Sequence, residues 1–211
     1  MILEPLPDDL RSLVVNNFNC VPSGFCSEEK AIKLAEVVWT LKPKWSVEIG
    51  VFGGKSFIPI STAVLYIDHN RGNHRAFGVD IWEANVAADQ YQNTPHENYW
   101  GNQSVHNFVR DQAFQAVKKL RTHSVQLYVS TSEEASLCFN DEEVGLCHID
   151  GNHSELHVHR DLNSWWPKIQ TGGVIVLDDL GWIPEKAVNW VKERSSLICE
   201  VGSSAFFKKE K

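Results

Sequence analysis

The stretch WSVEIGVFGGKS, residues 45–56, joins a short apolar run to a glycine-rich turn. The apolar run stops at the glycines, so we expect a buried strand that breaks into a turn. Gly50, Gly53 and Gly54 allow the backbone to turn tightly and to approach a ligand closely. A helix is expected directly after the turn, and its N-terminus would lie beside that ligand. The stretch matches neither G-x-x-x-x-G-K-[ST] nor G-x-G-x-x-G, so these two nucleotide-binding patterns are excluded here.

Strands and helices alternate on both sides of this stretch. Further strands are predicted for AFGVDIW, SVQLYVS, VGLCHIDG and GGVIVLDD, at residues 76–82, 124–130, 144–151 and 172–179, and for two final segments near 197–201 and 204–209. Helical periodicity fills most of the intervals between them. This alternation predicts an α/β fold with a mostly parallel sheet covered on both faces. We expect a doubly wound, Rossmann-like sheet of seven strands with an antiparallel hairpin at one edge.

The whole chain, residues 1–211, is expected to form a single domain. Residues 1–26 contain prolines and Gly24 and are predicted to be an irregular arm. Residues 83–103 are polar and aromatic without a clear period, and are predicted to be an insertion. One helix is expected to end at Gly172 and Gly173, because glycine commonly terminates helices.

Composition excludes several classes of protein. The apolar fraction is 43 % and the charged fraction 22 %, which is ordinary for a globular domain. The net charge of −7 gives no basic footprint for a nucleic-acid or membrane-surface partner. No apolar run approaches the length of a membrane helix, and the N-terminus lacks a basic signal-peptide region. The five cysteines form no C-x-x-C pair, so we expect a reducing, cytoplasmic location, with a Cys20–Cys26 bridge or metal site as the alternative.

Two acidic residues follow the first two strands of the predicted sheet. In parallel sheets, ligands bind at the carboxyl ends of the strands. Asp80 ends the second strand and is well placed to accept hydrogen bonds from both hydroxyls of a ribose; the alternative is a loop-capping role. Trp82 could flank an adenine ring or belong to the core. Glu48 lies inside the first strand end, where an acid could bind a cationic or hydroxyl-bearing ligand.

Three carboxylates and an imidazole follow the next strand ends. Asp150, Asp178 and Asp179 offer oxygen ligands of the kind that suit Mg²⁺. Without a cation, clustered carboxylates repel one another. The alternative is that Asp179 caps the following turn and Asp150 caps the following helix. His153 would point toward the same strand ends and could accept a proton near neutral pH. A zinc site with His157 is disfavoured, because H-E-x-x-H is absent.

Residues 28–209 resemble class I S-adenosylmethionine-dependent methyltransferases, through VEIGVFGGKS and the position of Asp80. CHIDGNHSELHVHRDLNSWWPKIQTGGVIVLDD resembles their metal-dependent small-molecule and sugar O-methyltransferase branch, which includes the macrocin O-methyltransferases. The resemblance implies that Asp150, Asp178 and Asp179 hold Mg²⁺ or a similar divalent cation and that His153 is the general base. It also implies that S-adenosylmethionine contacts a set of residues around the glycine turn, namely Glu48, Gly50, Gly53, Gly54, Ser56, Asp80 and Trp82.

These observations predict a Mg²⁺-assisted O-methyltransferase acting on a hydroxylated small molecule or glycan. A metal-dependent hydrolase and a non-catalytic cofactor-binding module stay open as alternatives, and so does a homo-oligomer. The segment 83–103 is too long for an ordinary α/β connection and carries Tyr91, Tyr99 and Trp100, so we expect it to cover the substrate entrance. The alternative is a surface or subunit-contact segment.

Overall fold

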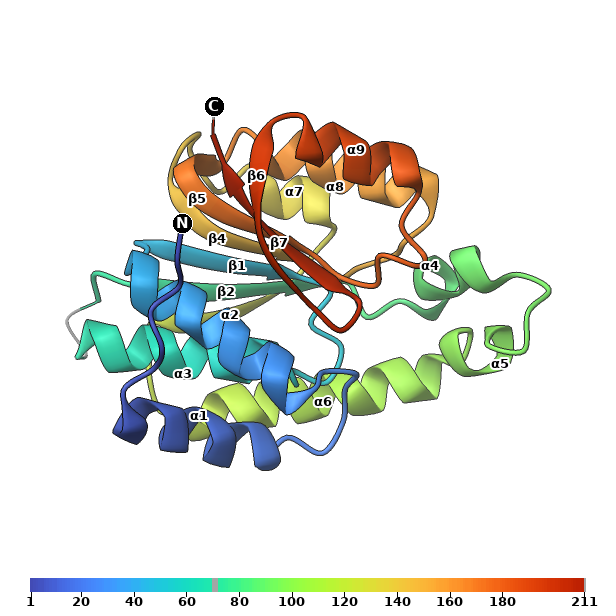
Figure 1. Cartoon of the computed structure of the whole chain (residues 1–211). Coiled ribbons are helices and arrows are strands. Elements are labelled where there is room, and N and C mark those ends of the chain that lie inside the picture. The colour runs from blue at the N-terminus through green and yellow to red at the C-terminus, as the bar shows by residue number, and fades with distance from the viewer. Residues whose placement is uncertain (70–71, 211) are drawn as a thin grey trace.

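A seven-stranded sheet forms the centre of the computed structural model, which describes residues 1–69 and 72–210 (Figure 1). Its strands lie in the order β3-β2-β1-β4-β5-β7-β6. Their bounds are β1 Trp45–Ile49, β2 Arg75–Asp80, β3 Val125–Val129, β4 Val144–Ile149, β5 Ile169–Leu177, β6 Ser195–Val201 and β7 Ser204–Lys209. The first five strands pair in parallel, whereas β7 is antiparallel to both β5 and β6. The predicted fold class, with its antiparallel edge, is confirmed.

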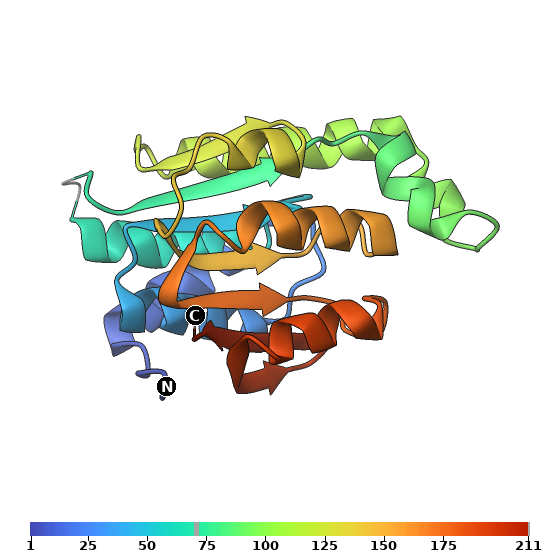
Figure 2. The ribbon, with the colours of Figure 1, turned by 90° about the horizontal axis from the view of Figure 1, so that it is seen from above.

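Helices cover both faces of the sheet, because each parallel crossover must pass over one face. One face is covered by α2 (Glu28–Leu41), α3 (Phe57–Asp68) and α6 (Gln103–Lys119), and α1 (Asp8–Asn19) packs on α2 and α3. The other face is covered by α7 (Ser132–Ser136), α8 (Glu155–Trp165) and α9 (Glu185–Lys192) (Figures 1 and 2). The short helices α4 (Ala84–Ala88), η1 (Asp89–Tyr91) and α5 (Glu97–Trp100) project beyond the carboxyl ends of the strands.

Side chains of β1 alternate between the two covered faces, as the two-residue period of a strand requires. Val47 and Ile49 belong to the apolar cluster that includes Trp165 of α8. Ser46 and Glu48 therefore point to the opposite face, and both are fully buried. A buried carboxylate is costly unless it is paired, so Glu48 must find partners inside the protein.

The expectation of an irregular segment over residues 1–26 is wrong for its central part. Residues 8–19 form α1, which starts after Pro7 and carries two acids in its first turn. Leu10, Val14 and Phe18 are buried and recur every four residues, which places them on one face of the helix. Leu10 and Val14 join the apolar cluster that contains residues of α2 and α3, against which α1 packs, so tertiary packing stabilises this helix although prolines precede it.

The helix expected to run to Gly172 and Gly173 ends earlier. α8 stops at Trp165, because Pro167 has no backbone N–H with which to continue the helical hydrogen bonds. β5 begins at Ile169 and runs through both glycines, with an irregular register against β4. Gly173 has no room for a Cβ, which would lie 2.9 Å from the carbonyl oxygen of Gln170. These glycines shape a strand and do not cap a helix.

Among the described residues, no helix has the length and apolar character needed to cross a membrane. All five cysteines carry free thiols, so the Cys20–Cys26 bridge is absent from the part of the chain that the structure describes.

Candidate active site

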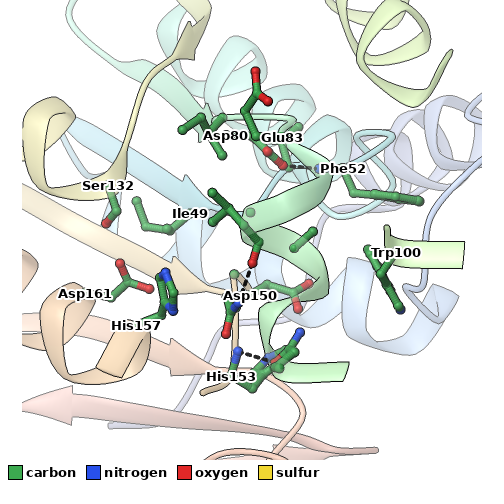
Figure 3. A pocket seen from close by; sticks show the side chains of 18 of the residues that line it. Ile49, Phe52, Asp80, Glu83, Trp100, Ser132, Asp150, His153, His157 and Asp161 are labelled. Atoms are coloured by element: carbon green, nitrogen blue, oxygen red, sulfur yellow. Dashed lines mark hydrogen bonds between the residues drawn. The ribbon is translucent and has the colours of Figure 1, made fainter. Parts of the chain in front are cut away.

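A cavity of about 920 Å³ opens at the carboxyl ends of β1, β2, β3 and β4. This volume lies at the upper end of the range for small-molecule sites. Figure 3 shows three groups of side chains around it: Asp80 and Glu83 together, Ser132, His157 and Asp161 on another side, and Asp150 with His153 at the base. The cavity therefore lies where the topology predicts a ligand site.

The turn after β1 forms one wall of the cavity. Gly50 has a φ of +85°, and a Cβ there would lie 2.2 Å from the carbonyl oxygen of Asp150. Only glycine fits, so the end of β1 presses directly against the end of β4. Gly50 and Ser56 line the cavity, whereas Gly53 and Gly54 do not. Gly53 instead lets the turn pack against the carbonyl oxygen of Ser23, which would be 2.4 Å from its Cβ.

Asp80 lines the cavity and also holds the turn in place. Its two carboxylate oxygens accept hydrogen bonds from the backbone N–H of Phe52, at 2.8 Å (Figure 3), and from that of Trp82, at 2.7 Å. Burial raises the pKa of Asp80, and these two backbone donors partly oppose that shift. Each oxygen keeps a further lone pair for a ligand.

Trp82 lies outside the cavity, contrary to the prediction that its ring flanks an adenine. The side chain is 2 % exposed and its Nε1 donates to the carbonyl oxygen of Phe52 at 2.9 Å. It packs with Val109 and Ala113 of α6 in the core. The ring therefore stabilises the turn from behind, which corresponds to the core alternative.

Glu48 also lies behind the cavity wall. It is fully buried, accepts a hydrogen bond from Ser56 Oγ and contacts His148 Nδ1, both at 2.9 Å. Burial disfavours a charged imidazole, but contacts with Asp178 and Glu48 raise the pKa of His148 to about 10. Glu48 therefore does not make the direct contact with a cofactor in this cavity that the resemblance implied. Sequence reasoning missed His148, although Glu48 and His148 are register partners on neighbouring strands.

The three predicted metal-binding carboxylates divide into two positions. Asp150 and Asp179 line the cavity, whereas Asp178 is 1 % exposed and lies deeper. Asp178 accepts hydrogen bonds from Ser204 Oγ at 2.6 Å and from the backbone N–H of Asp179 at 2.9 Å, both on Oδ1. Its Oδ2 pairs with the ammonium of Lys30 and lies 3.4 Å from His148 Nε2. Both oxygens of Asp178 are therefore occupied by protein groups.

His153 faces the cavity between Asp150 and Asp179. Each of these three residues offers one ligand atom, and the three atoms lie within 4.8 Å of one another. Neither ring nitrogen of the buried His153 has a hydrogen-bond partner among the described residues. Burial lowers the pKa of His153, and the nearby Asp179 and Asp178 partly offset this. The ring is therefore neutral at neutral pH and can accept a proton or bind a cation.

The segment 83–103 lies against this end of the cavity. Gln90 Oε1 accepts a hydrogen bond from the backbone N–H of His153 at 2.6 Å, and Asn152 Nδ2 donates to the carbonyl oxygen of Val86 at 2.7 Å. The segment thus shares a face of the molecule with His153. Its ordering by ligands stays a prediction.

Aromatic rings form the outer wall of the cavity near this segment. Tyr91 stacks on Trp100 with ring centroids 5.5 Å apart and an interplanar angle of 13°. Trp100 also contacts Phe25 and Phe52, and Tyr91 contacts Trp182 edge to face. Phe25 and Trp182 were missed by sequence reasoning, because their loops carry no local pattern that relates them to the cavity.

A further buried acid, Asp161 of α8, lines the opposite side of the cavity near Ser132 (Figure 3). Burial raises its pKa to about 7, although a hydrogen bond with Ser132 works in the other direction. Sequence analysis overlooked Asp161. The signal was present, since Val158, Asp161, Leu162 and Trp165 have helical spacing and a carboxylate interrupts this apolar face.

Comparisons with known proteins agree with this geometry. The family model described as a methyltransferase domain matches residues 47–180. The protein y4gI of Sinorhizobium fredii (strain NBRC 101917 / NGR234), described as uncharacterized, is 28 % identical over 143 residues; the match covers 68 % of this chain but only 14 % of y4gI.

Solved structures with this fold include the O-methyltransferase NovP, with a TM-score of 0.72, 14 % identity, and coverage of 97 % of this chain and 98 % of NovP. The SAM complex of the O-methyltransferase TomG from Streptomyces achromogenes, involved in tomaymycin synthesis, has a TM-score of 0.60, 14 % identity, and coverage of 99 % and 93 %. At such identities the structural similarity establishes the fold. Because the family model covers more than half of the sequence, from within β1 to the residues after β5, this chain belongs to the family of methyltransferase domains.

Proposed function

We propose that this protein is an S-adenosylmethionine-dependent O-methyltransferase acting on a hydroxylated small molecule or a sugar. One observation carries the proposal: a single cavity has Asp80 and the Gly50 turn on one side, and Asp150, His153 and Asp179 on another. The first side suits a nucleoside, and the second suits an acceptor hydroxyl. NovP and TomG, which share the fold, are O-methyltransferases.

The cofactor side would use Asp80 as its main polar contact. The carboxylate is already oriented by two backbone donors and keeps free lone pairs, so it can accept hydrogen bonds from two ribose hydroxyls. Gly50 permits close approach of the ligand to the backbone. S-adenosylmethionine, when bound, supplies an electrophilic methyl group.

A divalent cation fits only part of the predicted ligand set. Asp150, Asp179 and the unpartnered ring of His153 converge on one point, and carboxylate oxygens suit Mg²⁺. Asp178 does not fit as a ligand while Lys30, His148 and Ser204 engage its oxygens. We therefore assign the divalent cation to Asp150 and Asp179. Such an ion would lower the pKa of an acceptor hydroxyl and orient it.

His153 would remove the proton from the acceptor hydroxyl. The ring is neutral, lies beside Asp150 and Asp179, and has two unpartnered nitrogens, so one nitrogen can accept the proton at the moment of transfer. The stacked rings of Tyr91 and Trp100 offer a flat apolar surface for a sugar or aromatic acceptor. Two adjacent hydroxyls, as in a sugar diol or a catechol, would suit a site that chelates a cation.

Calorimetric titration with S-adenosylhomocysteine tests the cofactor assignment. We expect binding by the unmodified protein and a loss of about 1–3 kcal/mol in Asp80→Ala, because hydrogen bonds to a charged acceptor are lost. Asp111→Ala is the control, since Asp111 is exposed on α6 and should leave affinity unchanged. No binding by the unmodified protein would instead favour the metal-dependent hydrolase. Equal affinity in Asp80→Ala would refute the ribose contact.

Transfer of a labelled methyl group to sugar diols and catechols, with and without Mg²⁺, tests the reaction. Product formation supports the enzyme, whereas cofactor binding with no transfer to any hydroxylated acceptor favours the non-catalytic module.

A further inference from the structure

A lysine ammonium lies among the carboxylates at the ends of β4 and β5. Lys30, in the first turn of α2, is 5 % exposed. Its Nζ pairs with Asp178 Oδ2 and lies 3.9 Å from Asp150 Oδ2. Two of the three carboxylates that the sequence assigned to a metal therefore share a cation that belongs to the protein.

The surrounding contacts hold this ammonium in place. Nζ also donates to the carbonyl oxygen of Phe25 at 3.5 Å, which connects the N-terminal arm to the acidic cluster. The α2 N-terminus is itself ordered, because Ser27 Oγ accepts a hydrogen bond from the backbone N–H of Lys30 at 3.1 Å. To bind at Asp178, a divalent ion would have to displace a buried ammonium and leave it without its partner, which is strongly unfavourable.

Pairing divides these carboxylates into two groups. Glu48 contacts His148 and Asp178 contacts Lys30, both inside the protein. Asp150 and Asp179 line the cavity, where an added cation can reach them.

We propose that Lys30 is the resident cation of the inner carboxylates, and that it excludes divalent metal from Asp178 and confines it to the cavity side of the cluster. The inference deepens the proposed function, because it concerns the metal of that same site. It also makes an independent statement: without the ammonium, His148, Asp150 and Asp178 form a second metal site. Their ligand atoms already lie within 4.8 Å of one another.

Binding of Mn²⁺ alone, followed by electron paramagnetic resonance of the free ion, tests the proposal without any measurement of activity. For the unmodified protein we expect one Mn²⁺ per chain. Asp179→Asn should weaken its affinity more than about tenfold and clearly more than Asp178→Asn does, because of these two aspartates only Asp179 contacts the ion. Lys30→Met, which keeps most of the length of the side chain and removes its charge, should bind a second Mn²⁺. Adding Asp178→Asn to it should remove that second ion.

The outcomes separate this inference from the proposed function. Equal weakening by Asp178→Asn and Asp179→Asn would overturn the inference, and so would a folded Lys30→Met protein that gains no Mn²⁺. If the unmodified protein binds no Mn²⁺ but Lys30→Met binds one, the metal in the proposed function fails and the role of Lys30 stands. Circular dichroism and S-adenosylhomocysteine binding verify that each variant folds. Should Lys30→Met not fold, the comparison of Asp178→Asn with Asp179→Asn decides alone.

Discussion

Replacement of Asp161 by asparagine should change how the stability of the ligand-free protein depends on pH. Asp161 is 5 % exposed, and burial raises its pKa from an ordinary value of 3.8 to about 7. The native state therefore keeps this proton up to about pH 7, whereas the unfolded chain releases it near pH 3.8. Between these two pH values the native state holds the extra proton, so a rise in pH destabilises the native state. Above pH 7 both states have lost the proton and the contribution is constant.

The size of the effect follows from the pKa difference. At about 1.36 kcal/mol per pKa unit, the interval from pH 5 to about 7 corresponds to about 3 kcal/mol. Asparagine has nearly the same shape and does not titrate. Between pH 5 and pH 8 the free energy of unfolding of the unmodified protein should therefore fall by about 2–3 kcal/mol relative to that of Asp161→Asn.

Urea denaturation of both proteins at pH 5, 6, 7 and 8 measures this difference. Glu155→Gln is the matched control, because Glu155 is an exposed acid on the same helix and its removal should leave the pH dependence unchanged. Parallel curves for the unmodified protein and Asp161→Asn would refute the reasoning, since they would mean that Asp161 ionises alike in the native and unfolded states.

Three further predictions follow from the site. Gly50→Ala should lower the free energy of unfolding by more than about 2 kcal/mol, because its Cβ would overlap the backbone of Asp150. Gly172→Ala is the control, since Gly172 has a similar φ of +82° but no neighbour within 4 Å, and it should cost about 1 kcal/mol. Equal losses of stability in thermal denaturation of the two variants would contradict this. His153→Ala should lower the rate of methyl transfer by about 10²–10⁴-fold with S-adenosylhomocysteine affinity retained, and the exposed His159→Ala should have no effect. A parallel loss of cofactor affinity would make His153 a structural residue. Residues 83–103 should gain protection in hydrogen exchange when cofactor, Mg²⁺ and acceptor bind, and unchanged exchange would refute the covering role.

Much of the candidate site could be predicted from the sequence because its signals are local. A short apolar run before an acid or glycine marks a strand end, and parallel strands bring their carboxyl ends to one edge. Asp80, Asp150, His153 and Asp179 were expected at that edge, and all four line the cavity.

Local signals also misled where packing decides. The prolines in residues 1–26 suggested an irregular segment, but the buried apolar face of α1 makes its centre helical. The ring of Trp82 packs in the core and not in the cavity. Both outcomes depend on neighbours that come from distant parts of the chain.

The sequence by itself determined which strands form, where they end and which acids follow them, since each of these properties depends on a few consecutive residues. The tertiary structure alone decided how those acids are neutralised. Glu48 contacts His148 across one hundred residues, and Lys30 contacts Asp178 across 148. No periodicity encodes such pairs. The physical reason is that buried charges must be compensated, and the compensating group is whichever one the register of the sheet and the packing of α2 bring within reach.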